Sequence, residues 1–330
     1  MDLLSVKTIK NLLAEGARGA SSRSAGTPRS GARKRQAVGA RPRKGLGQNF
    51  LTSKGVLGDI LKAANLKKSD TVFEVGPGIG TLTRELARCA KRVIAVEKDS
   101  AMVNILRETT KDLHNIEIIQ GDILKQNLVG LSYPQLSPTK YKVVANLPYY
   151  ITSPVIRLFL EAENKPDLMV FMVQKEVAQR ICAKPRTRTS SVRGRPPMNL
   201  LAVSVQFYAT PSIVSYVKKS CFWPQPKVDS AILRINTSIS HGREILMSPE
   251  KQKLFFRIVK AGFKQPRKQL ANNLSHALPG MLDARRLTRS EQKEQVEIWL
   301  NENNINPKQR AETLSVEDWI NLSQDYTMEK

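Results

Sequence analysis

Hydrophobic positions in the first two thirds of the chain follow two alternating patterns. Short runs rich in β-branched residues predict buried strands, and segments with apolar residues every three or four positions predict the helices between the first of them. The predicted strands are residues 71–75, 92–96, 117–119, 142–145 and 168–173, and the predicted helices are 81–90 and 100–110. This alternation favours an α/β fold, in which a mostly parallel sheet has helices on both faces.

The pattern changes in the last third of the chain. Residues 200–209 and 230–235 predict two further strands, which we expect to form an antiparallel pair. Beyond about residue 245 the apolar spacing is helical, over residues 250–263, 267–276, 289–301 and 315–323. We therefore expect an α/β domain over residues 44–244 and a small all-helical domain over residues 245–330.

The N-terminal segment, residues 1–43, has a character of its own. Apolar residues at helical spacing predict an amphipathic helix over residues 3–13. Residues 16–40 are mostly Gly, Ala, Ser and Arg, a composition that cannot bury enough surface to order itself, so we expect disorder there. Organellar transit peptides share this composition, but here the basic run follows a helix containing Asp2 and Glu15, so import is the less favoured alternative.

Charge is the bulk property that changes this picture most. The 330 residues include 53 Lys and Arg against 29 Asp and Glu, a net charge of +24. Residues 1–43 hold 10 of the bases and two of the acids, so a net charge of +16 remains on the rest of the chain. A positive field of this size favours a polyanionic partner, most commonly nucleic acid. A basic surface kept for solubility is the alternative.

The remaining composition excludes several classes of protein. Three Cys without a CxxC pair and only three His indicate neither a disulfide framework nor a zinc site, so no metal is expected and a reducing, cytoplasmic compartment fits. No window of eighteen consecutive apolar residues occurs, so no membrane partner is expected. The absence of an apolar core with a small-residue cleavage site argues against secretion.

A glycine-rich turn follows the first predicted strand and precedes a predicted helix. Its glycines, Gly76, Gly78 and Gly80, let the backbone turn sharply and approach a ligand without a Cβ in the way. The spacing is GxGxG rather than GxGxxG, because Thr81 occupies the position of the last glycine or alanine in a dinucleotide fingerprint. This disfavours an NAD-dependent oxidoreductase, which remains one alternative.

Two carboxylates follow the next two predicted strands. Glu97 comes 19 residues after Gly78, where it can accept hydrogen bonds from both hydroxyls of a ribose and would repel a 2′-phosphate. Asp122 follows the third strand, where it can accept an adenine amino group. Either acid alone is equally explained as a helix cap or a solvated loop residue. Together with the glycine turn they indicate an adenosine ligand without a pyrophosphate, which S-adenosylmethionine satisfies.

A tetrapeptide, Asn146-Leu147-Pro148-Tyr149, follows the strand at 142–145 and carries the candidate chemistry. The amine of adenine is a poor nucleophile, because its lone pair is delocalised into the ring. The Asn146 side-chain carbonyl and the Leu147 backbone carbonyl can accept its two N–H groups and aim the lone pair at a methyl group. Tyr149 can stack on the base, and Phe222, in a proline-rich segment, can form a second stacking wall. The alternatives are a turn whose Tyr packs in the core and an apolar loop covering the sheet end.

Taken together, these stretches resemble the ribosomal-RNA adenine dimethyltransferase family that acts on the small subunit. The resemblance covers roughly residues 1–15 and 41–323. It is carried by residues 44–51, 74–80, 146–154, 172–178, 222–230, 264–274 and 310–315.

The resemblance implies a Rossmann-like, S-adenosylmethionine-dependent methyltransferase domain with a small helical domain that binds rRNA. It implies a monomer that dimethylates the N6 amines of two adjacent adenosines near the 3′ end of small-subunit, 16S-type rRNA, in a pre-30S ribosomal particle. The implied cofactor contacts are Asn49, Leu51, Gly76, Gly78, Glu97, Asp122 and Asn146. The implied frame of the target amine is Asn146, Leu147, Pro148 and Tyr149, with Phe222 stacking.

Two basic segments depart from the family pattern and two rival functions stay open. Residues 16–40 and 185–197 look like insertions, and we expect them to contact RNA phosphates unless they are simply solvated loops. A resistance-type methyltransferase of large-subunit rRNA would share the catalytic motifs. A ribosome-assembly factor in which binding outweighs turnover would share the fold, although the intact tetrapeptide argues against it.

Overall fold

The computed structural model describes residues 2–21, 47–125, 140–186, 196–237, 247–277 and 288–326. Most of the two basic segments, at 22–46 and 187–195, lies outside the described residues, so the predictions for them are not tested. The chain divides into two compact units, residues 1–178 with 212–237 and residues 179–211 with 238–330. The second unit thus includes residues 179–211, which the sequence pattern placed in the catalytic domain.

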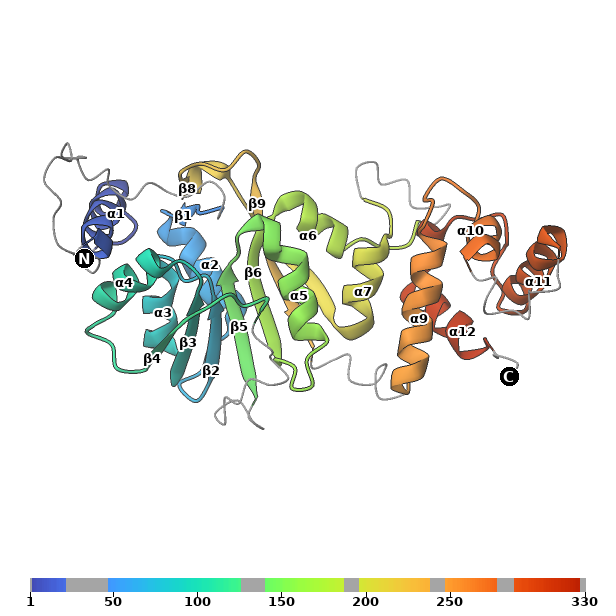
Figure 1. The fold of residues 1–330 in the computed structure, drawn as a ribbon, viewed down its shortest axis with the longest axis horizontal. Coiled ribbons are helices and arrows are strands. Elements are labelled where there is room, and N and C mark those ends of the chain that lie inside the picture. The colour runs from blue at the N-terminus through green and yellow to red at the C-terminus, as the bar shows by residue number, and fades with distance from the viewer. Residues whose placement is uncertain are drawn as a thin grey trace, which may run out of the picture. The chain divides into compact units, whose positions relative to one another are not determined.

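One seven-stranded sheet organises the first unit within the described residues (Figure 1). Its strand order is β4-β3-β2-β5-β6-β9-β7. The bounds are β2 Thr71–Val75, β3 Arg92–Glu97, β4 Ile116–Gln120, β5 Tyr141–Asn146, β6 Leu168–Gln174, β7 Thr210–Val217 and β9 Ser230–Asn236. The pairs from β4 to β6 are parallel, and β9 pairs antiparallel with β6. The predicted α/β fold with a mostly parallel sheet is confirmed.

Helices cover both faces of this sheet, as the alternation of side chains along β2 requires. Val72 belongs to the same core cluster as Leu82 and Leu86 of α3, so this face lies under α2 and α3. Phe73 points to the other face, where its ring meets the ring of Phe159 on α5 at 5.6 Å between centroids. The helices of this unit are α1 Val6–Ser21, α2 Lys54–Ala64, α3 Thr81–Cys89, α4 Ser100–Thr109, α5 Thr152–Leu160 and the start of α6 Lys175–Ile181.

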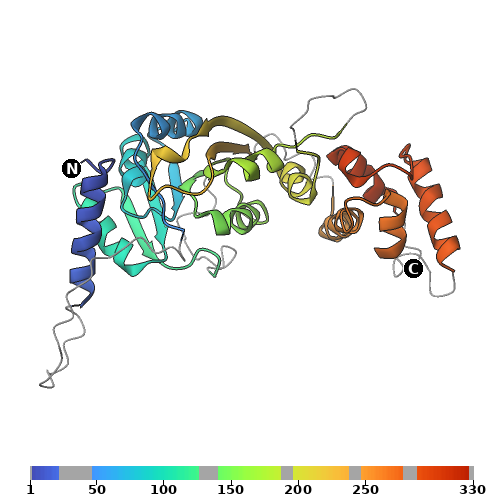
Figure 2. The same ribbon diagram turned by 90° about the horizontal axis from the view of Figure 1, so that it is seen from above.

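The N-terminal helix α1 packs against α4, beside which it lies in both views (Figure 2). Its apolar face and the preceding Leu3 form a core cluster with residues of α4 and of the pocket described below: Leu3, Ile9, Leu12, Leu13, Phe50, Ile79, Met102 and Ile105. The predicted helix is confirmed but is longer than expected, because α1 continues to Ser21. The helix therefore includes residues 16–21, which we expected to be disordered. No described helix has both the length and the apolar character needed to cross a membrane.

The prediction of a strand at residues 200–209 is wrong. Leu200–Tyr208 is a helix, α7, and β9 pairs with β6 rather than with this segment. A nearly continuous apolar run fits a buried helix as well as a buried strand. The capping residue settles the choice, because the Asn199 side chain accepts the backbone N–H of Ala202 at 3.1 Å. The sequence pattern also missed β7, which follows directly and alternates between more and less exposed side chains.

The second unit is helical in its described residues after 247. Its helices are α7, α9 Pro249–Gly262, α10 Leu270–Ala277, α11 Arg289–Glu302 and α12 Val316–Gln324. Aromatic rings join α7 to α9, where Phe207 stacks on Phe255 at 4.4 Å between centroids. Close packing of α9 on α12 requires a glycine, because a Cβ at Gly262 would lie 2.3 Å from the Trp319 ring. The predicted helices at 250–263, 289–301 and 315–323 thus form, each within two residues of the expected ends.

Candidate functional site

A pocket opens at the carboxyl ends of the parallel strands β2, β3, β4 and β5, the edge at which open α/β sheets bind ligands. Its lining comes from residues 47–51, 74–79, 81–82, 96–98, 121–124 and 146–151, with Ile60 from α2. Ten of the eleven site residues expected from the sequence line it, namely Asn49, Leu51, Gly76, Gly78, Glu97, Asp122, Asn146, Leu147, Pro148 and Tyr149. The topology of the sheet therefore brings together residues that are far apart in the sequence.

The glycine turn forms the floor of the pocket between β2 and α3. Gly76 and Gly78 adopt φ angles of 66° and 60°, a region that residues with a Cβ rarely enter. The N–H of Gly76 donates to the Val96 carbonyl at 2.9 Å, which ties the turn to the end of β3. A Cβ at Gly78 would lie 3.4 Å from the Phe50 ring of the pocket wall. Glycine at these positions therefore keeps the backbone open to a ligand.

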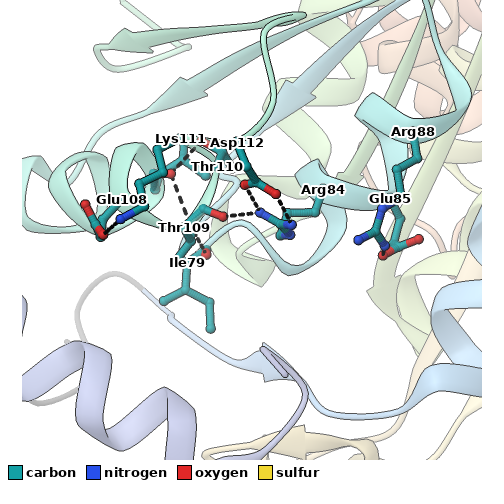
Figure 3. Close-up of polar contacts among 10 residues, drawn as sticks. Ile79, Arg84, Glu85, Arg88, Glu108, Thr109, Thr110, Lys111 and Asp112 are labelled. Carbon is teal, nitrogen blue, oxygen red and sulfur yellow. Dashed lines mark hydrogen bonds and ion pairs between the residues drawn. The ribbon is translucent and has the colours of Figure 1, made fainter. Parts of the chain in front are cut away.

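The far end of the turn is braced by the C-terminal end of α4 (Figure 3). The Thr109 hydroxyl donates to the carbonyl of Ile79 at 2.9 Å. Arg84, from the first turns of α3, donates to the Thr109 carbonyl and forms an ion pair of 2.6 Å with Asp112. Gly80 lies between these contacts with a φ of 88°. The conformation of the turn thus depends on contacts with α4 as well as on its own glycines.

We expect Gly80→Ala to destabilise the protein. Its Cβ would lie 2.8 Å from Leu106 and 3.0 Å from the Thr109 hydroxyl, and alanine at positive φ costs roughly 1–2 kcal/mol before any clash. With overpacking of about 1–3 kcal/mol added, thermal unfolding should shift to a clearly lower Tm. Gly58→Ala is the matched control, because this glycine is inside α2 with nothing within 4 Å of a Cβ, and alanine there should stabilise by about 0.5–1 kcal/mol. Equal Tm values for the two variants would contradict the prediction.

Glu97 is the last residue of β3, and its carboxylate binds the backbone of both the glycine turn and the residues that follow β3. One carboxylate oxygen accepts the N–H of Gly78 at 3.1 Å, and the other accepts the N–H of Asp99 at 2.8 Å. Only 8% of the residue is exposed, and this burial raises the pKa of its carboxyl despite the two backbone hydrogen bonds. A carboxylate has about four acceptor positions, so Glu97 keeps the capacity to accept a hydrogen bond from a ligand. Glu97 is therefore placed to receive the two hydroxyls of a ribose.

Asp122 follows β4 and lines the same pocket. One oxygen lies 2.9 Å from Nζ of Lys98, and the other accepts the N–H of Leu124 at 3.1 Å. The hydrogen bond from Lys98 lowers the pKa of the Asp122 carboxyl. An ionised carboxylate at this position can accept the amino group of an adenine. Lys98 is the residue directly after Glu97, a position that the sequence analysis did not single out.

Asn146, the last residue of β5, has a fixed orientation. Its side-chain N–H donates to the backbone carbonyl of Asn49 at 3.1 Å, across 97 residues of sequence. The Asn49 side chain in turn donates to the carbonyl of Gly47 at 3.2 Å. Because the amide nitrogen is engaged in this way, the amide oxygen of Asn146 is the group left to accept a hydrogen bond from a ligand. The residue can therefore act as an oriented acceptor.

The rest of the tetrapeptide supports this geometry. Leu147 is buried and its N–H donates to the Met172 carbonyl at 3.3 Å, which continues the contact between β5 and β6. Tyr149 is half-buried, and its hydroxyl lies 2.7 Å from the Ser230 hydroxyl of β9. Burial raises the pKa of the Tyr149 phenol, so it stays neutral. The Tyr149 ring thus lines the pocket while its polar end is anchored to the sheet.

Phe222 is the predicted site residue that the structure does not bring to the pocket. It begins the short strand β8 Phe222–Trp223, which pairs with β1 Phe50–Leu51. Its side chain is only 3% exposed and packs in the core cluster beneath α2 and α3. An aromatic residue next to prolines fits a core position as well as a stacking position, and the sequence does not distinguish them. The exposed ring at the pocket is Tyr150, which the sequence analysis did not assign.

The charges that line the pocket are suited to a cationic ligand. Glu74, Glu97 and Asp122 line it, against Lys98 as the only base among the described lining residues. This excess of acid is notable in a chain of net charge +24. An adenosine bearing a sulfonium and an ammonium group fits such a pocket, whereas a dinucleotide would bring two phosphates to these carboxylates. The residues present therefore fit S-adenosylmethionine.

The order of the strands in the sheet also favours S-adenosylmethionine over a dinucleotide. A dinucleotide-binding Rossmann sheet has six strands in the order 3-2-1-4-5-6. Here the final strand, β9, lies between β6 and β7 and pairs antiparallel with β6.

Fold and pocket together define the class: a Rossmann-like methyltransferase that uses S-adenosylmethionine. A family model described as "Ribosomal RNA adenine dimethylase" matches residues 39–326, and the chain belongs to this family.

Individual relatives agree with this assignment. The chain is 46% identical over 290 residues to "Ribosomal RNA small subunit methyltransferase A" of Dehalococcoides mccartyi, which covers 87% of this chain and 89% of that protein. It is 39% identical over 280 residues to the protein of the same name from Clostridioides difficile, covering 85% and 89%. Among solved structures, a dimethyladenosine transferase from Plasmodium falciparum superposes with a TM-score of 0.66 and 26% identity, covering 83% and 95%. The 23S rRNA methyltransferase ErmE superposes with a TM-score of 0.61 and 26% identity, covering 84% and 99%.

Proposed function

We propose that this protein transfers methyl groups from S-adenosylmethionine to the N6 amines of two adjacent adenosines near the 3′ end of small-subunit rRNA. Four methyl groups would be added in all, as part of small-subunit maturation. The observation that carries the proposal is the orientation of Asn146, whose amide N–H is held by the Asn49 carbonyl beside the glycine turn. This arrangement presents an oriented acceptor next to a pocket suited to a cationic adenosine.

The chemistry asks little of the protein beyond alignment. The cofactor supplies a methyl group on a sulfonium, which is electrophilic without further activation. The Asn146 amide oxygen and the Leu147 carbonyl accept the two N–H groups of the adenine amine, so that its lone pair faces the methyl group. The Tyr149 ring holds the base by stacking. Rate enhancement then comes from proximity and from fixed dipoles, and the product ammonium loses its proton to water or to these acceptors.

The names of the relatives favour the small-subunit substrate, and the charge of the chain favours RNA in general. Relatives at 39–46% identity over about 85% of the chain carry a small-subunit name, whereas the similarity to the 23S rRNA enzyme ErmE is 26%. The net charge of +24 suits a phosphate-rich partner. We further propose that the protein acts as a monomer in the cytoplasm on a pre-30S particle, and that the two basic segments contact RNA phosphates.

In the deciding experiment, the purified protein is incubated with labelled S-adenosylmethionine and either undermethylated small subunits or large subunits. The nucleosides of the rRNA are then analysed. We expect N6,N6-dimethyladenosine in small-subunit rRNA, at two adjacent positions near the 3′ end. Label in large-subunit rRNA instead would favour a resistance-type enzyme. Absence of dimethyladenosine from both would reject the proposal and favour an assembly factor that keeps the fold.

A further inference from the structure

We propose that Glu74 determines the preference of this pocket for a positively charged cofactor, by holding a proton in the ligand-free protein and releasing it when S-adenosylmethionine binds. This inference rests on the proposed assignment of the pocket. Glu74 is the fourth residue of β2, directly before the glycine turn. It has no part in the methyl transfer described above.

The position of Glu74 is unusual for an acid. It is 1% exposed, lies opposite Ala95 of β3 in the centre of the sheet, and contributes to the lining of the pocket. One carboxyl oxygen, Oε2, is buried and has no hydrogen-bond partner among the described residues. An ionised carboxylate in such a place is strongly disfavoured unless a cation accompanies it. The geometry thus leaves a carboxyl group whose charge lacks a partner until a ligand arrives.

The groups around Glu74 leave its charge uncompensated. Burial raises the pKa of Glu74 to about 8, a smaller opposing effect comes from the Thr83 hydroxyl on α3, and the charge of Glu97 on β3 adds to the rise. On the side of β5, the pocket presents the uncharged Asn146. The base that lines the pocket, Lys98, lies 2.9 Å from Asp122 and is engaged there. At neutral pH the carboxyl therefore holds its proton.

A sulfonium changes this balance, and the product of the reaction restores it. S-adenosylmethionine carries a sulfonium, an ammonium and a carboxylate, whereas S-adenosylhomocysteine has a neutral thioether in place of the sulfonium. When the cation enters, the Glu74 carboxyl would lose its proton to solvent, and the carboxylate would balance part of the positive charge. After methyl transfer the sulfonium is gone, so the carboxyl takes a proton back from solvent. The protein thus favours the methyl donor with its sulfonium over the product, which has lost that positive charge.

The competition between the proton on Glu74 and the cation determines how the affinity for S-adenosylmethionine changes with pH. A proton on Glu74 opposes binding of the cation, so affinity for S-adenosylmethionine rises with pH and levels off above the ligand-free pKa of about 8. Between pH 6 and 7 the gain should approach tenfold, because nearly every binding event must then displace a proton. Affinity for S-adenosylhomocysteine should change much less over the same interval.

The test is calorimetric titration of the full chain with S-adenosylmethionine at pH 7, in buffers of different ionisation enthalpy. The measured binding enthalpy changes linearly with the ionisation enthalpy of the buffer, and the slope gives the number of protons released. We expect the wild type to release close to one proton more than Glu74→Gln, which keeps the shape of the side chain but cannot ionise. Titration of the ammonium of the ligand contributes equally to both proteins and cancels in the difference. Glu108→Gln, at an exposed acid of α4, should release as many protons as the wild type.

Infrared difference spectra provide a second readout that does not depend on the variant folding. In the wild type, S-adenosylmethionine should remove the carbonyl band of a protonated carboxyl group, and S-adenosylhomocysteine should leave it. Equal proton release by the wild type and Glu74→Gln, or an unchanged carbonyl band, would overturn the role of Glu74 while leaving the proposed function intact. Failure of the wild type to bind S-adenosylmethionine at all would instead overturn the assignment of the pocket, and this inference with it.

Discussion

Asn146→Ala is expected to lower the rate of methyl transfer about 10²–10³-fold, the usual effect of removing one oriented dipole from a reaction centre. Its amide oxygen is available to the adenine amine because its N–H is held by Asn49 at 3.1 Å. Alanine removes both the acceptor and this contact between β5 and the loop before β1. The cofactor is held mainly by other residues, so its affinity should change only a few-fold.

Single-turnover methylation of small subunits at saturating cofactor measures this effect without contributions from product release. Asn146→Asp keeps an acceptor oxygen but replaces the donating amide nitrogen with a second carboxylate oxygen against the Asn49 carbonyl, so we expect it to retain more activity than the alanine variant but less than the wild type. Asn104→Ala, at an exposed position of α4, serves as the matched control and should leave the rate unchanged. A wild-type rate in Asn146→Ala would remove the tetrapeptide from the mechanism.

Glu97→Ala should have the largest effect on cofactor binding, raising the Kd for S-adenosylmethionine about 10²–10⁴-fold. Hydrogen bonds to a charged group contribute roughly 1.5–3 kcal/mol each, and the two ribose hydroxyls would lose their acceptor together. The loss extends to the protein itself, because the same carboxylate accepts the N–H groups of Gly78 and Asp99. Without it, the glycine turn and the start of α4 lose a common anchor.

Equilibrium titration with S-adenosylmethionine and with adenosine separates these contributions. Loss of affinity for both ligands in equal proportion indicates that Glu97 acts on the adenosine moiety, as we expect. Glu108→Ala, at an exposed acid that pairs with Lys111, should bind both ligands as the wild type does. Thermal unfolding in the absence of ligand shows how much of the change in Kd results from a less stable protein. An unchanged Kd in a folded Glu97→Ala protein would contradict the assignment of the ribose site.

Most of the candidate site is predictable because its determinants are local. A strand that ends in a glycine turn, a carboxylate at the end of the next strand, and an Asn-Leu-Pro-Tyr segment after a third are each visible in a few residues. Parallel strands place their carboxyl ends at one edge of the sheet, so the order of these motifs already predicts that they meet. The hydrogen bond from the Gly78 N–H to the Glu97 carboxylate, across 19 residues, results directly from this arrangement of strands.

Other features depend on contacts that a local pattern does not contain. The apolar run at 200–209 is compatible with a strand and a helix, and the Asn199 cap together with burial in a helical unit selects the helix. Phe222 satisfies the composition of a stacking residue, but pairing of β8 with β1 turns it into the core. Helix α1 extends to Ser21 although its sequence after Glu15 is poor in apolar residues.

The sequence by itself therefore determined the sheet, the pocket edge and the chemical class, because these follow from hydrophobic period and from the order of short motifs. Tertiary structure alone decided which side chains are oriented and which are charged. Asn146 is held by a carbonyl 97 residues away, and Glu74 has a raised pKa because it is enclosed by neighbouring strands and helices. Orientation and ionisation depend on the surroundings of a group in space, and a folded chain creates those surroundings from residues that are distant in sequence.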